Sequence, residues 1–341
     1  MQTNKLIEQL IAKTDLSREQ MQQFMQACMR GELSDAEIAA FLVLLRAKGE
    51  TVEELTTAAT VMMQSAHCIA LPPDLVDIVG TGGDGRNTFN ISTVSSFVAA
   101  AAGAKVAKHG ARSASSQSGS ADLLLAAGFE LLLSDADFLQ CLTECGICFL
   151  FAPHFHHALQ QVKNARQQLK IRTFFNLLGP LLNPAQVKRL VVGVSDAKWL
   201  RPLAEVLVHL GKERVFLINS RDGLDEVSVA APTDVVEFNH GQWKNWHIDP
   251  KTYGLSHPNL EGIVIESPEQ SLNLSLKVLN GEPGPARDIV LLNAAAALFC
   301  AGTAQSYEDA LQKAAFAIDS GEAKKRFDRL KNLTQQLKAK A

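Results

Sequence analysis

Strand patterns alternate with helix patterns through the middle of the chain, between residues 75 and 220. The apolar run LVDIVG is followed by the helix pattern STVSSFVAAAAG, then by the strand pattern KVAKHG and the helix pattern SADLLLAAG. The same alternation continues through CFLFAP, LVVGVS, LRPLAEVLVHLG and RVFLIN, and DVVEFNHGQWKNWHID after them is typical of antiparallel strands. Parallel strands need long crossovers, which are usually helices. The pattern therefore predicts an α/β fold with a mostly parallel central sheet flanked by helices.

The first seventy residues show a different pattern, in which apolar residues recur at helical spacing. Three capping boxes, each a Ser or Thr with Gln or Glu three residues later, indicate helix starts. They are Ser17 with Gln20, Ser34 with Glu37, and Thr51 with Glu54. LPPD at residues 71–74 then breaks the helical pattern. Because 341 residues are enough for two domains, we expect a small all-helical domain over residues 1–70 and a larger α/β domain over residues 71–341.

The glycine-rich segment GTGGDG at residues 80–85 follows the first predicted strand. It matches G-x-G-x-x-G, but a dinucleotide site also needs an acid about twenty residues later. No Asp or Glu occurs between Asp84 and Asp122, and that interval instead contains ten Ser and Thr residues and four Lys and Arg residues. Glycine amides, hydroxyl groups and a helix N-terminus all donate hydrogen bonds to anionic oxygens. We therefore expect a ligand with more than one phosphate, rather than a segment that only makes turns.

An acidic segment, SRDGLDEVS, follows the last predicted parallel strand and contains Asp222, Asp225 and Glu226. In open α/β sheets, ligands bind beyond the carboxyl ends of the strands. Mg²⁺ favours one or two carboxylates together with phosphate oxygens. An exposed acidic turn is the alternative, but a nearby phosphate loop favours the adjacent Asp225 and Glu226 as a metal site.

Several other features limit the possible functions. The net charge of −3 gives no reason to expect a nucleic acid or an anionic membrane as partner. The N-terminus MQTNKLIEQLIAK lacks the apolar segment of a secretion signal, and no apolar run is long enough to span a bilayer, so we expect a cytoplasmic protein.

The C-x3-C-x2-C spacing of Cys141, Cys145 and Cys148 is better explained by a helix and a buried strand than by an iron–sulfur cluster. HFHH at residues 154–157 has no nearby carboxylate or cysteine in the sequence, so we discount it as a zinc site.

Five longer segments resemble the anthranilate phosphoribosyltransferase family in their residues, order and spacing. They are GTGGDGRNTFNIST, the run from VAKHG to SGSADLL, FAPHFH, ARQQLKIRTFFNLLGPLLNPA and GLDEVS. The resemblance covers nearly the whole chain. It implies transfer of the phosphoribosyl group of 5-phosphoribosyl-1-pyrophosphate to the amine of anthranilate, in tryptophan biosynthesis. It also implies a nucleoside phosphorylase/phosphoribosyltransferase-like fold, two Mg²⁺ ions per subunit, and a homodimer joined through the helical domain, which takes in helices from about residues 155–182.

Matched position by position, the resemblance implies three groups of site residues. The group that binds 5-phosphoribosyl-1-pyrophosphate is Gly80, Gly83, Asp84, Thr88, Asn90, Ser92, Thr93, Lys108, His109, Gly110, Arg112, Ser115, Ser116 and Ser120. The group that binds anthranilate is Gly80, Ala111, Arg166, Gly179 and Pro180. The group that binds the metal is Ser92, Asp225 and Glu226. The assignment of Arg166 agrees with its chemistry, because a guanidinium can bind a planar carboxylate through two parallel hydrogen bonds.

One position departs from the family pattern. The family has KHGNR, with an asparagine that contacts anthranilate, whereas residues 108–112 are KHGAR and Ala111 has no side-chain donor. This leaves open a phosphoribosyltransferase with a different aromatic amine as acceptor. Two further alternatives are a nucleoside phosphorylase and a non-catalytic relative that binds phosphate-rich ligands or nucleic acid.

Overall fold

The computed structural model describes residues 3–113 and 117–340. Ser115 and Ser116, two of the residues implied for the phosphate site, lie outside the described residues. Within the described ranges, no helix has the length and apolar character needed to cross a membrane.

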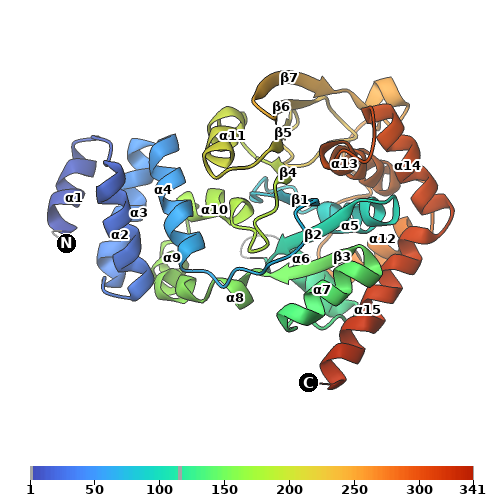
Figure 1. Cartoon of the computed structure of the whole chain (residues 1–341). Coiled ribbons are helices and arrows are strands. Elements are labelled where there is room, and N and C mark those ends of the chain that lie inside the picture. The colour runs from blue at the N-terminus through green and yellow to red at the C-terminus, as the bar shows by residue number, and fades with distance from the viewer. Residues whose placement is uncertain (1–2, 114–116, 341) are drawn as a thin grey trace.

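Four helices at the N-terminal end form a bundle beside the rest of the molecule (Figure 1). They are α1 (Thr3–Ile11), α2 (Arg18–Arg30), α3 (Asp35–Lys48) and α4 (Val52–Gln64). Helices α2, α3 and α4 each begin with a reciprocal capping box, which confirms the three boxes predicted from the sequence. Their apolar faces pack together, with α2 against α4 and α1 against α3.

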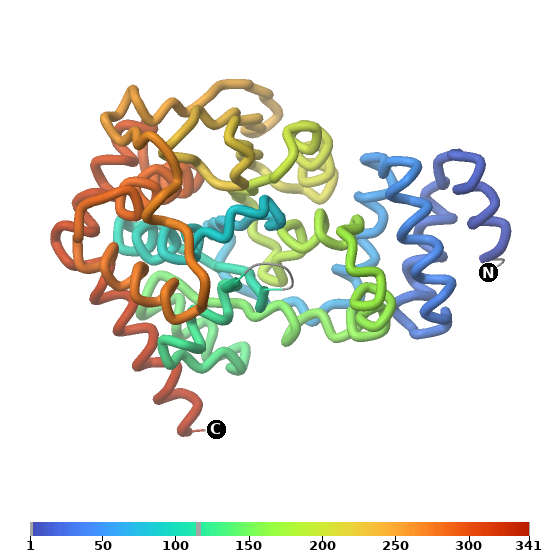
Figure 2. Tube along the Cα trace, turned by 180° about the vertical axis from the view of Figure 1, so that it is seen from behind, coloured from blue at the N-terminus to red at the C-terminus, as the bar shows by residue number. Residues whose placement is uncertain are grey.

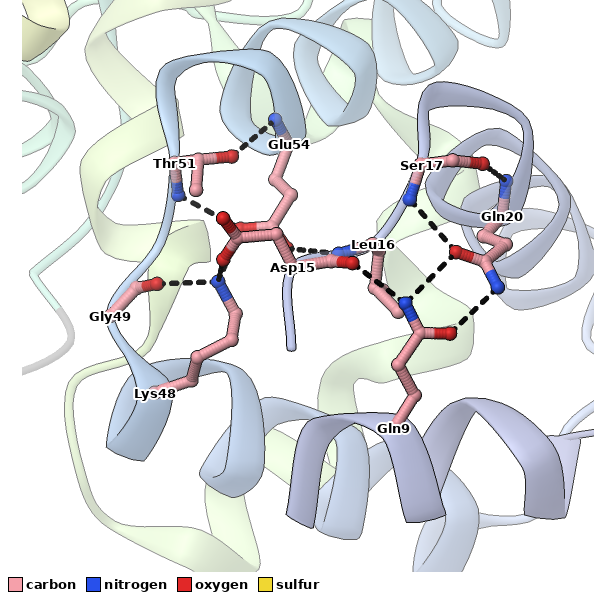
Figure 3. Close-up of polar contacts among 9 residues, drawn as sticks. All are labelled: Gln9, Asp15, Leu16, Ser17, Gln20, Lys48, Gly49, Thr51 and Glu54. Atoms are coloured by element: carbon pink, nitrogen blue, oxygen red, sulfur yellow. Dashed lines mark hydrogen bonds and ion pairs between the residues drawn. The ribbon is translucent and has the colours of Figure 1, made fainter. Parts of the chain in front are cut away.

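A buried carboxylate, that of Glu54, ties the connections of this bundle together (Figure 3). It accepts hydrogen bonds from the backbone N–H of Leu16 at 2.9 Å and of Thr51 at 2.8 Å. The Lys48 ammonium donates to Glu54 at 3.0 Å and to Asp15 at 2.6 Å. A buried charge is tolerated only with such partners, so this one side chain fixes the connection between α1 and α2 to the start of α4.

A seven-stranded sheet forms the centre of the larger domain, with the strand order β3-β2-β1-β4-β5-β6-β7. The strands are β1 (Leu75–Gly80), β2 (Lys105–Gly110), β3 (Ile147–Phe151), β4 (Arg189–Gly193), β5 (Arg214–Ser220), β6 (Thr233–Asn239) and β7 (Gln242–Ile248). Strands β1 to β5 are parallel, and β6 and β7 are antiparallel. The mostly parallel sheet and the antiparallel strands after it are thus confirmed.

Helices cover both faces of this sheet (Figure 1). Helices α5 and α13 pack on each other and against β1, and α11 packs against β5 and β6 on the opposite side. The helices of this domain are α5 (Ile91–Ala101), α6 (Ser120–Ala126), α7 (Asp135–Cys145), α11 (Leu200–His209), α12 (Pro268–Leu279), α13 (Pro285–Ala301), α14 (Tyr307–Asp319) and α15 (Glu322–Lys340). Most residues of α13 are buried because this helix lies between the sheet and α14. Cys141, Cys145 and Cys148 are buried and free in α7 and β3, as their interpretation as core residues predicts.

A connecting segment, residues 152–182, leaves the sheet after β3 and packs against the bundle (Figure 2). It contains α8 (Ala152–Phe155), η1 (His157–Val162), α9 (Lys163–Leu169), α10 (Phe174–Leu178) and η2 (Gly179–Leu181). Within it, η1 contacts α2, α9 contacts α3 and α10 contacts α4. Two backbone hydrogen bonds join the stretches of chain that run between the bundle and the sheet. The His67 N–H donates to the Phe155 carbonyl at 2.8 Å, and the Ile69 N–H donates to the Pro184 carbonyl at 3.1 Å. The segment therefore holds its side chains between the two parts of the molecule.

Candidate active site

A pocket of about 350 Å³ opens beyond the carboxyl ends of β1 and β2, where the sheet faces the connecting segment. The glycine loop, residues 80–85, forms one wall. Residues 108–113 after β2, residues 118–120 and the start of α5 continue this wall, and the connecting segment forms the other. Asp225 and Glu226 also line the pocket, so segments far apart in the sequence meet at this edge of the sheet.

The backbone of the glycine loop comes very close to Asp225. The Gly82 N–H donates to the Asp225 carboxylate at 2.6 Å, and the Thr81 N–H donates to the Gly193 carbonyl at 2.9 Å. A Cβ atom added to Gly80 would meet the Asp225 carboxylate. Glycine at position 80 is therefore required by packing within the protein, whatever ligand the loop binds.

Three carboxylates gather at the floor of the pocket. Asp225 is buried, Glu226 is half-buried beside it, and Asp84 is close enough to repel Asp225. Burial, and then the charge of Asp84, raise the pKa of Asp225 to about 7. Burial and the neighbouring Asp225 also raise the pKa of Glu226, whereas Lys108 and a backbone hydrogen bond from Ser92 lower it. Burial and mutual repulsion therefore destabilise the ionised forms of Asp225 and Glu226, and protein groups offset this only in part.

These acids fit a divalent cation, which would relieve both their burial and their mutual repulsion. Across residues 3–113 and 117–340, no group of three or more His, Cys, Asp or Glu side chains could hold a metal ion. A Mg²⁺ ion that also binds phosphate needs fewer protein ligands, because one or two carboxylates and the phosphate oxygens suffice. Asp225 and Glu226, with Ser92 bonded to Glu226 through its backbone, match such a donor set.

Asn90, implied as a ligand residue, immediately precedes α5 and is engaged by protein groups. Its Nδ2 donates to the Ser118 carbonyl at 3.1 Å. Its Oδ1 accepts from the hydroxyl groups of Ser118 at 2.8 Å and Ser271 at 2.7 Å. In this structure Asn90 therefore fastens the 118–120 wall and α12 to the start of α5. Nothing in the sequence indicated the role of Ser271.

Lys108 is almost completely buried on β2 at the base of the pocket. Its Nζ donates to the Ile78 carbonyl at 2.6 Å. Burial lowers the pKa of Lys108, while the charges of Asp77 and Glu226 raise it. The Lys108 amino group is thus near both a core acid, Asp77, and a pocket acid, Glu226.

The wall formed by the connecting segment carries a cation beside an aromatic ring. The Arg166 guanidinium lies over the Phe175 ring, with its carbon 5.1 Å from the ring centroid. Burial lowers the pKa of Arg166, but a guanidinium remains charged in proteins. Gly179 and Pro180 line the pocket near this pair, and Ala111 lines it from the other wall. This end of the pocket suits a flat ligand that carries a carboxylate.

Two buried histidines, His109 and His156, also line this part of the pocket. Their rings meet edge to face with centroids 5.4 Å apart. Burial lowers the pKa of both imidazoles, to well below the usual range for His109, and so favours their uncharged forms. The His156 Nε2 lies 2.9 Å from the Leu182 carbonyl, and the His109 Nε2 is paired with no group among the described residues. The two rings therefore line the pocket near Arg166 without adding a second positive charge.

The structure brings most of the implied site residues to this one pocket. Those that line it are Gly80, Gly83, Asp84, Thr88, Asn90, Ser92, Lys108, His109, Gly110, Ala111, Arg112, Ser120, Arg166, Gly179, Pro180, Asp225 and Glu226. Thr93 differs, because it is buried in α5 and is not part of the pocket wall. Ser115 and Ser116 cannot be placed because they lie outside the described residues.

Sequence reasoning missed three side chains of this region, namely His156, Phe175 and Arg172. The first two line the pocket, and Arg172 contacts the glycine loop. All three lie within segments that were recognised, FAPHFH and ARQQLKIRTFFNLLGPLLNPA. A search of those segments for polar and aromatic residues without a role could have found them.

Asp225 is expected to make the metal-free protein less stable as the pH rises. An unfolded Asp has a pKa of about 4, and in the folded protein burial and Asp84 raise it to about 7. Between these values the folded state holds a proton that the unfolded state has lost, so stability falls as pH increases across this window. The gain in melting temperature from Asp225→Asn, measured without Mg²⁺, should be larger at about pH 8 than at about pH 5. An equal gain at both pH values would contradict the prediction.

Comparison with known proteins first defines the class. A family described as "Glycosyl transferase family, a/b domain" matches residues 72–324. A second, described as "Glycosyl transferase family, helical bundle domain", matches residues 4–66. The chain thus has the two domains of this glycosyl transferase family, a helical bundle domain and an a/b domain.

Individual relatives define the family more narrowly. The chain is 59% identical over 337 residues to the anthranilate phosphoribosyltransferase of Legionella pneumophila (strain Paris), covering 99% of this chain and 98% of the relative. It is 48% identical to that of Hydrogenovibrio crunogenus, covering 98% and 99% of the two chains. The crystal structure of the Thermus thermophilus enzyme superimposes with a TM-score of 0.89 at 38% identity, covering 96% and 99%. The Saccharomyces cerevisiae enzyme in complex with PRPP and Mg has a TM-score of 0.89 at 27% identity, covering 98% of each chain. The chain belongs to the anthranilate phosphoribosyltransferase family.

Proposed function

We propose that the protein transfers the 5-phosphoribosyl group of 5-phosphoribosyl-1-pyrophosphate (PRPP) to the amine of anthranilate, with Mg²⁺, in tryptophan biosynthesis. The products are N-(5-phosphoribosyl)anthranilate and pyrophosphate. One observation carries the proposal. A single pocket has a glycine loop with buried acids at one end and a guanidinium over an aromatic ring at the other. Such a pocket suits a polyphosphate and a flat carboxylate held side by side.

In this reaction the bond between the ribose C1 and the pyrophosphate oxygen breaks, and the anthranilate nitrogen bonds to C1. That nitrogen then releases one of its two protons to the departing pyrophosphate or to water, which leaves the neutral secondary amine of the product. Negative charge grows on the pyrophosphate and positive charge on the ribose. The amides of the glycine loop and the N-terminus of α5 can donate to phosphate oxygens, and Lys108 supplies positive charge beneath them. When bound, Mg²⁺ would neutralise part of the pyrophosphate charge. Asp225, Glu226 and Ser92 are the residues that would hold it.

The anthranilate amine is the nucleophile, and it needs no base to activate it because its lone pair is free at neutral pH. The protein's task is to orient it toward C1, and orientation of two reactants is a large source of rate enhancement. Arg166 binds the anthranilate carboxylate, and Phe175, Gly179, Pro180 and the neutral His109 border the ring. We propose that each subunit binds two Mg²⁺ ions, because three carboxylates meet at the floor of the pocket.

The direct test is a turnover assay that follows the loss of anthranilate fluorescence in the presence of PRPP and Mg²⁺. We expect turnover that disappears on chelation of Mg²⁺. The same protein is assayed with a nucleoside and inorganic phosphate, and in a salt-titrated DNA-binding experiment. Phosphorolysis without phosphoribosyl transfer would favour a nucleoside phosphorylase. Salt-sensitive DNA binding without turnover would favour a non-catalytic relative.

Substituting Ala111→Asn is expected to improve the use of anthranilate. Ala111 lines the pocket but offers no side-chain donor, whereas an amide could reach the acceptor. One neutral hydrogen bond contributes about 0.5–1.5 kcal/mol, so kcat/KM for anthranilate should rise roughly three- to thirtyfold, mostly through KM. The KM for PRPP should hardly change, because Lys108 and the glycine loop are unaltered.

A panel of substituted anthranilates, run on both variants, tests the other explanation of Ala111. In that explanation the smaller side chain makes room for a bulkier aromatic amine. If Asn leaves anthranilate kinetics unchanged and the Ala111 protein prefers another acceptor, the protein is a phosphoribosyltransferase with a shifted acceptor preference.

We also propose that residues 1–70 and the connecting segment act as one domain and that this domain forms a homodimer interface in a cytoplasmic enzyme. The packing of α9 and α10 on α3 and α4 supports the first part. The exposed apolar side chains of Ile11 on α1 and Val43 on α3 support the second. Light scattering after size exclusion measures the mass directly, and a monomer at assay concentration would exclude the dimer.

A further inference from the structure

Arg172, in the loop between α9 and α10, reaches across from the connecting segment to the glycine loop. Its Nη1 donates to the Gly82 carbonyl, and its Nη2 donates to the Thr81 carbonyl at 3.0 Å. A guanidinium presents several donors in one rigid plane, which suits two adjacent carbonyl groups. The contact therefore holds two successive peptide groups of the loop at once.

This contact fixes the direction of the loop amides. A trans peptide group points its C=O and N–H to opposite sides. In the peptide between Thr81 and Gly82, the carbonyl is held by Arg172 and the N–H by Asp225 at 2.6 Å. In the next peptide, Arg172 holds the Gly82 carbonyl, so the Gly83 N–H points away from the guanidinium. Arg172 thus determines where the loop can donate hydrogen bonds.

The residue type at position 83 depends on the same contact. Gly83 has φ +73°, a conformation that favours glycine, and a Cβ atom added there would meet the Arg172 guanidinium. The space beside the Gly83 backbone is therefore filled by a protein side chain. The glycine loop is shaped to receive this arginine.

A second arginine continues the connection into the bundle. Arg46, on α3, donates through Nη1 to the backbone carbonyl of Arg172. The chain of contacts therefore runs from α3 through the loop before α10 to the glycine loop. Burial and the charge of Arg46 lower the pKa of Arg172, whereas the nearby carboxylates of Asp225 and Asp84 raise it. A guanidinium remains charged in proteins, so the two acids attract Arg172 toward the glycine loop.

We propose that Arg172 is a positioning residue that orients the glycine-loop amides for the phosphates of PRPP and couples this loop to the helical bundle through Arg46. The inference rests on the proposed function for the identity of the phosphate ligand. The orientation of the loop itself does not depend on it. Arg172 contacts the backbone of Thr81 and Gly82 and is not among the residues that line the pocket, whereas Arg166 is.

The first experiment uses the protein without substrates. Amide hydrogen exchange of residues 80–86 is compared in the parent, Arg172→Ala, Arg172→Lys, Arg46→Ala and the control Lys163→Ala. Lys163 begins α9 and is exposed, so the control removes a positive charge from the same segment. We expect faster exchange in Arg172→Ala, a smaller increase in Arg172→Lys and Arg46→Ala, and parent-like exchange in the control.

The second experiment measures both KM values. Arg172→Ala removes the charged donor that holds the carbonyls of the glycine loop. The KM for PRPP should therefore rise about tenfold in this variant. Arg172→Lys should reverse part of the rise in KM, because an ammonium keeps the charge but cannot hold two carbonyl groups in one plane as a guanidinium can. The KM for anthranilate should stay within about twofold of the parent value. A purely structural role for Arg172 would raise both KM values together and would not be rescued by lysine.

The two experiments separate the inference from the proposed function. If the parent forms no product from PRPP and anthranilate, the proposed function fails, and loop exchange still decides whether Arg172 orients the loop. Unchanged loop exchange in a folded Arg172→Ala would overturn the inference, as would an equal rise in both KM values. If Arg172→Ala does not fold, Arg46→Ala carries the test, and parent-like loop exchange in that variant overturns the coupling.

Discussion

Phosphoribosyl transfer should be nearly abolished in the double variant Asp225→Asn/Glu226→Gln, and the residual rate should need much more Mg²⁺. Both carboxylates lie at the floor of the pocket, and burial raises the pKa of both. Burial therefore destabilises the ionised carboxylates, and a cation bound between these carboxylates and the pyrophosphate offsets that destabilisation. Amides of the same size keep the shape but remove the negative charge that holds the cation.

The measurement is kcat as a function of Mg²⁺ concentration, with calorimetry of Mg²⁺ and pyrophosphate binding as a readout that does not require turnover. Asp225 also accepts from the Gly82 N–H, and an asparagine oxygen can still accept that bond. The matched control is Glu261→Gln/Glu282→Gln, which removes two charges from exposed positions. If the double variant keeps the parent kcat and Mg²⁺ dependence, the metal assignment is wrong.

Local sequence signals predicted the parts of the fold that depend on local physics. A capping box needs only a hydroxyl residue and a Glu or Gln three positions later, and the boxes at Ser17, Ser34 and Thr51 are all formed. The alternation of apolar runs and helix patterns likewise predicted the parallel sheet. CFLFAP shows where this reasoning is least exact, because β3 ends at Phe151 and Ala152 already begins α8. A proline is well accommodated in the first turn of a helix, so Pro153 does not extend the strand.

The site depended on contacts between residues far apart in the chain. The glycine pattern and the acidic pair indicated a phosphate and metal site, but the bond between Gly82 and Asp225 spans 143 positions. The contact of Arg172 with Gly82 spans 90 positions. No periodicity or local motif encodes such a pairing, and Asn90 similarly bonds to a serine of α12 rather than standing open to a ligand. Sequence therefore predicted which residues share the pocket better than it predicted the contacts that each side chain makes there.

The two substrates should respond differently to the loss of Arg166. Its guanidinium lies over the Phe175 ring in the connecting segment. The glycine loop and the residues after β2, where we propose that the phosphates bind, form the other wall of the pocket. Arg166→Ala should therefore raise the KM for anthranilate and change that for PRPP little. A charge-assisted contact contributes about 1.5–3 kcal/mol, which corresponds to roughly a ten- to hundredfold change.

Arg166→Lys shows whether charge alone is sufficient. A lysine keeps the cation but cannot form two parallel bonds to a carboxylate or cover the Phe175 ring as a flat group. We expect Arg166→Lys to reverse only part of the rise in the KM for anthranilate. We also expect benzene-ring analogues without a carboxylate to bind equally weakly to the parent and to Arg166→Ala. Initial rates at saturating PRPP give the KM for anthranilate, and a second series at saturating anthranilate gives the KM for PRPP. If both values rise equally, Arg166 supports the connecting segment, and the carboxylate of the acceptor must be held by another group.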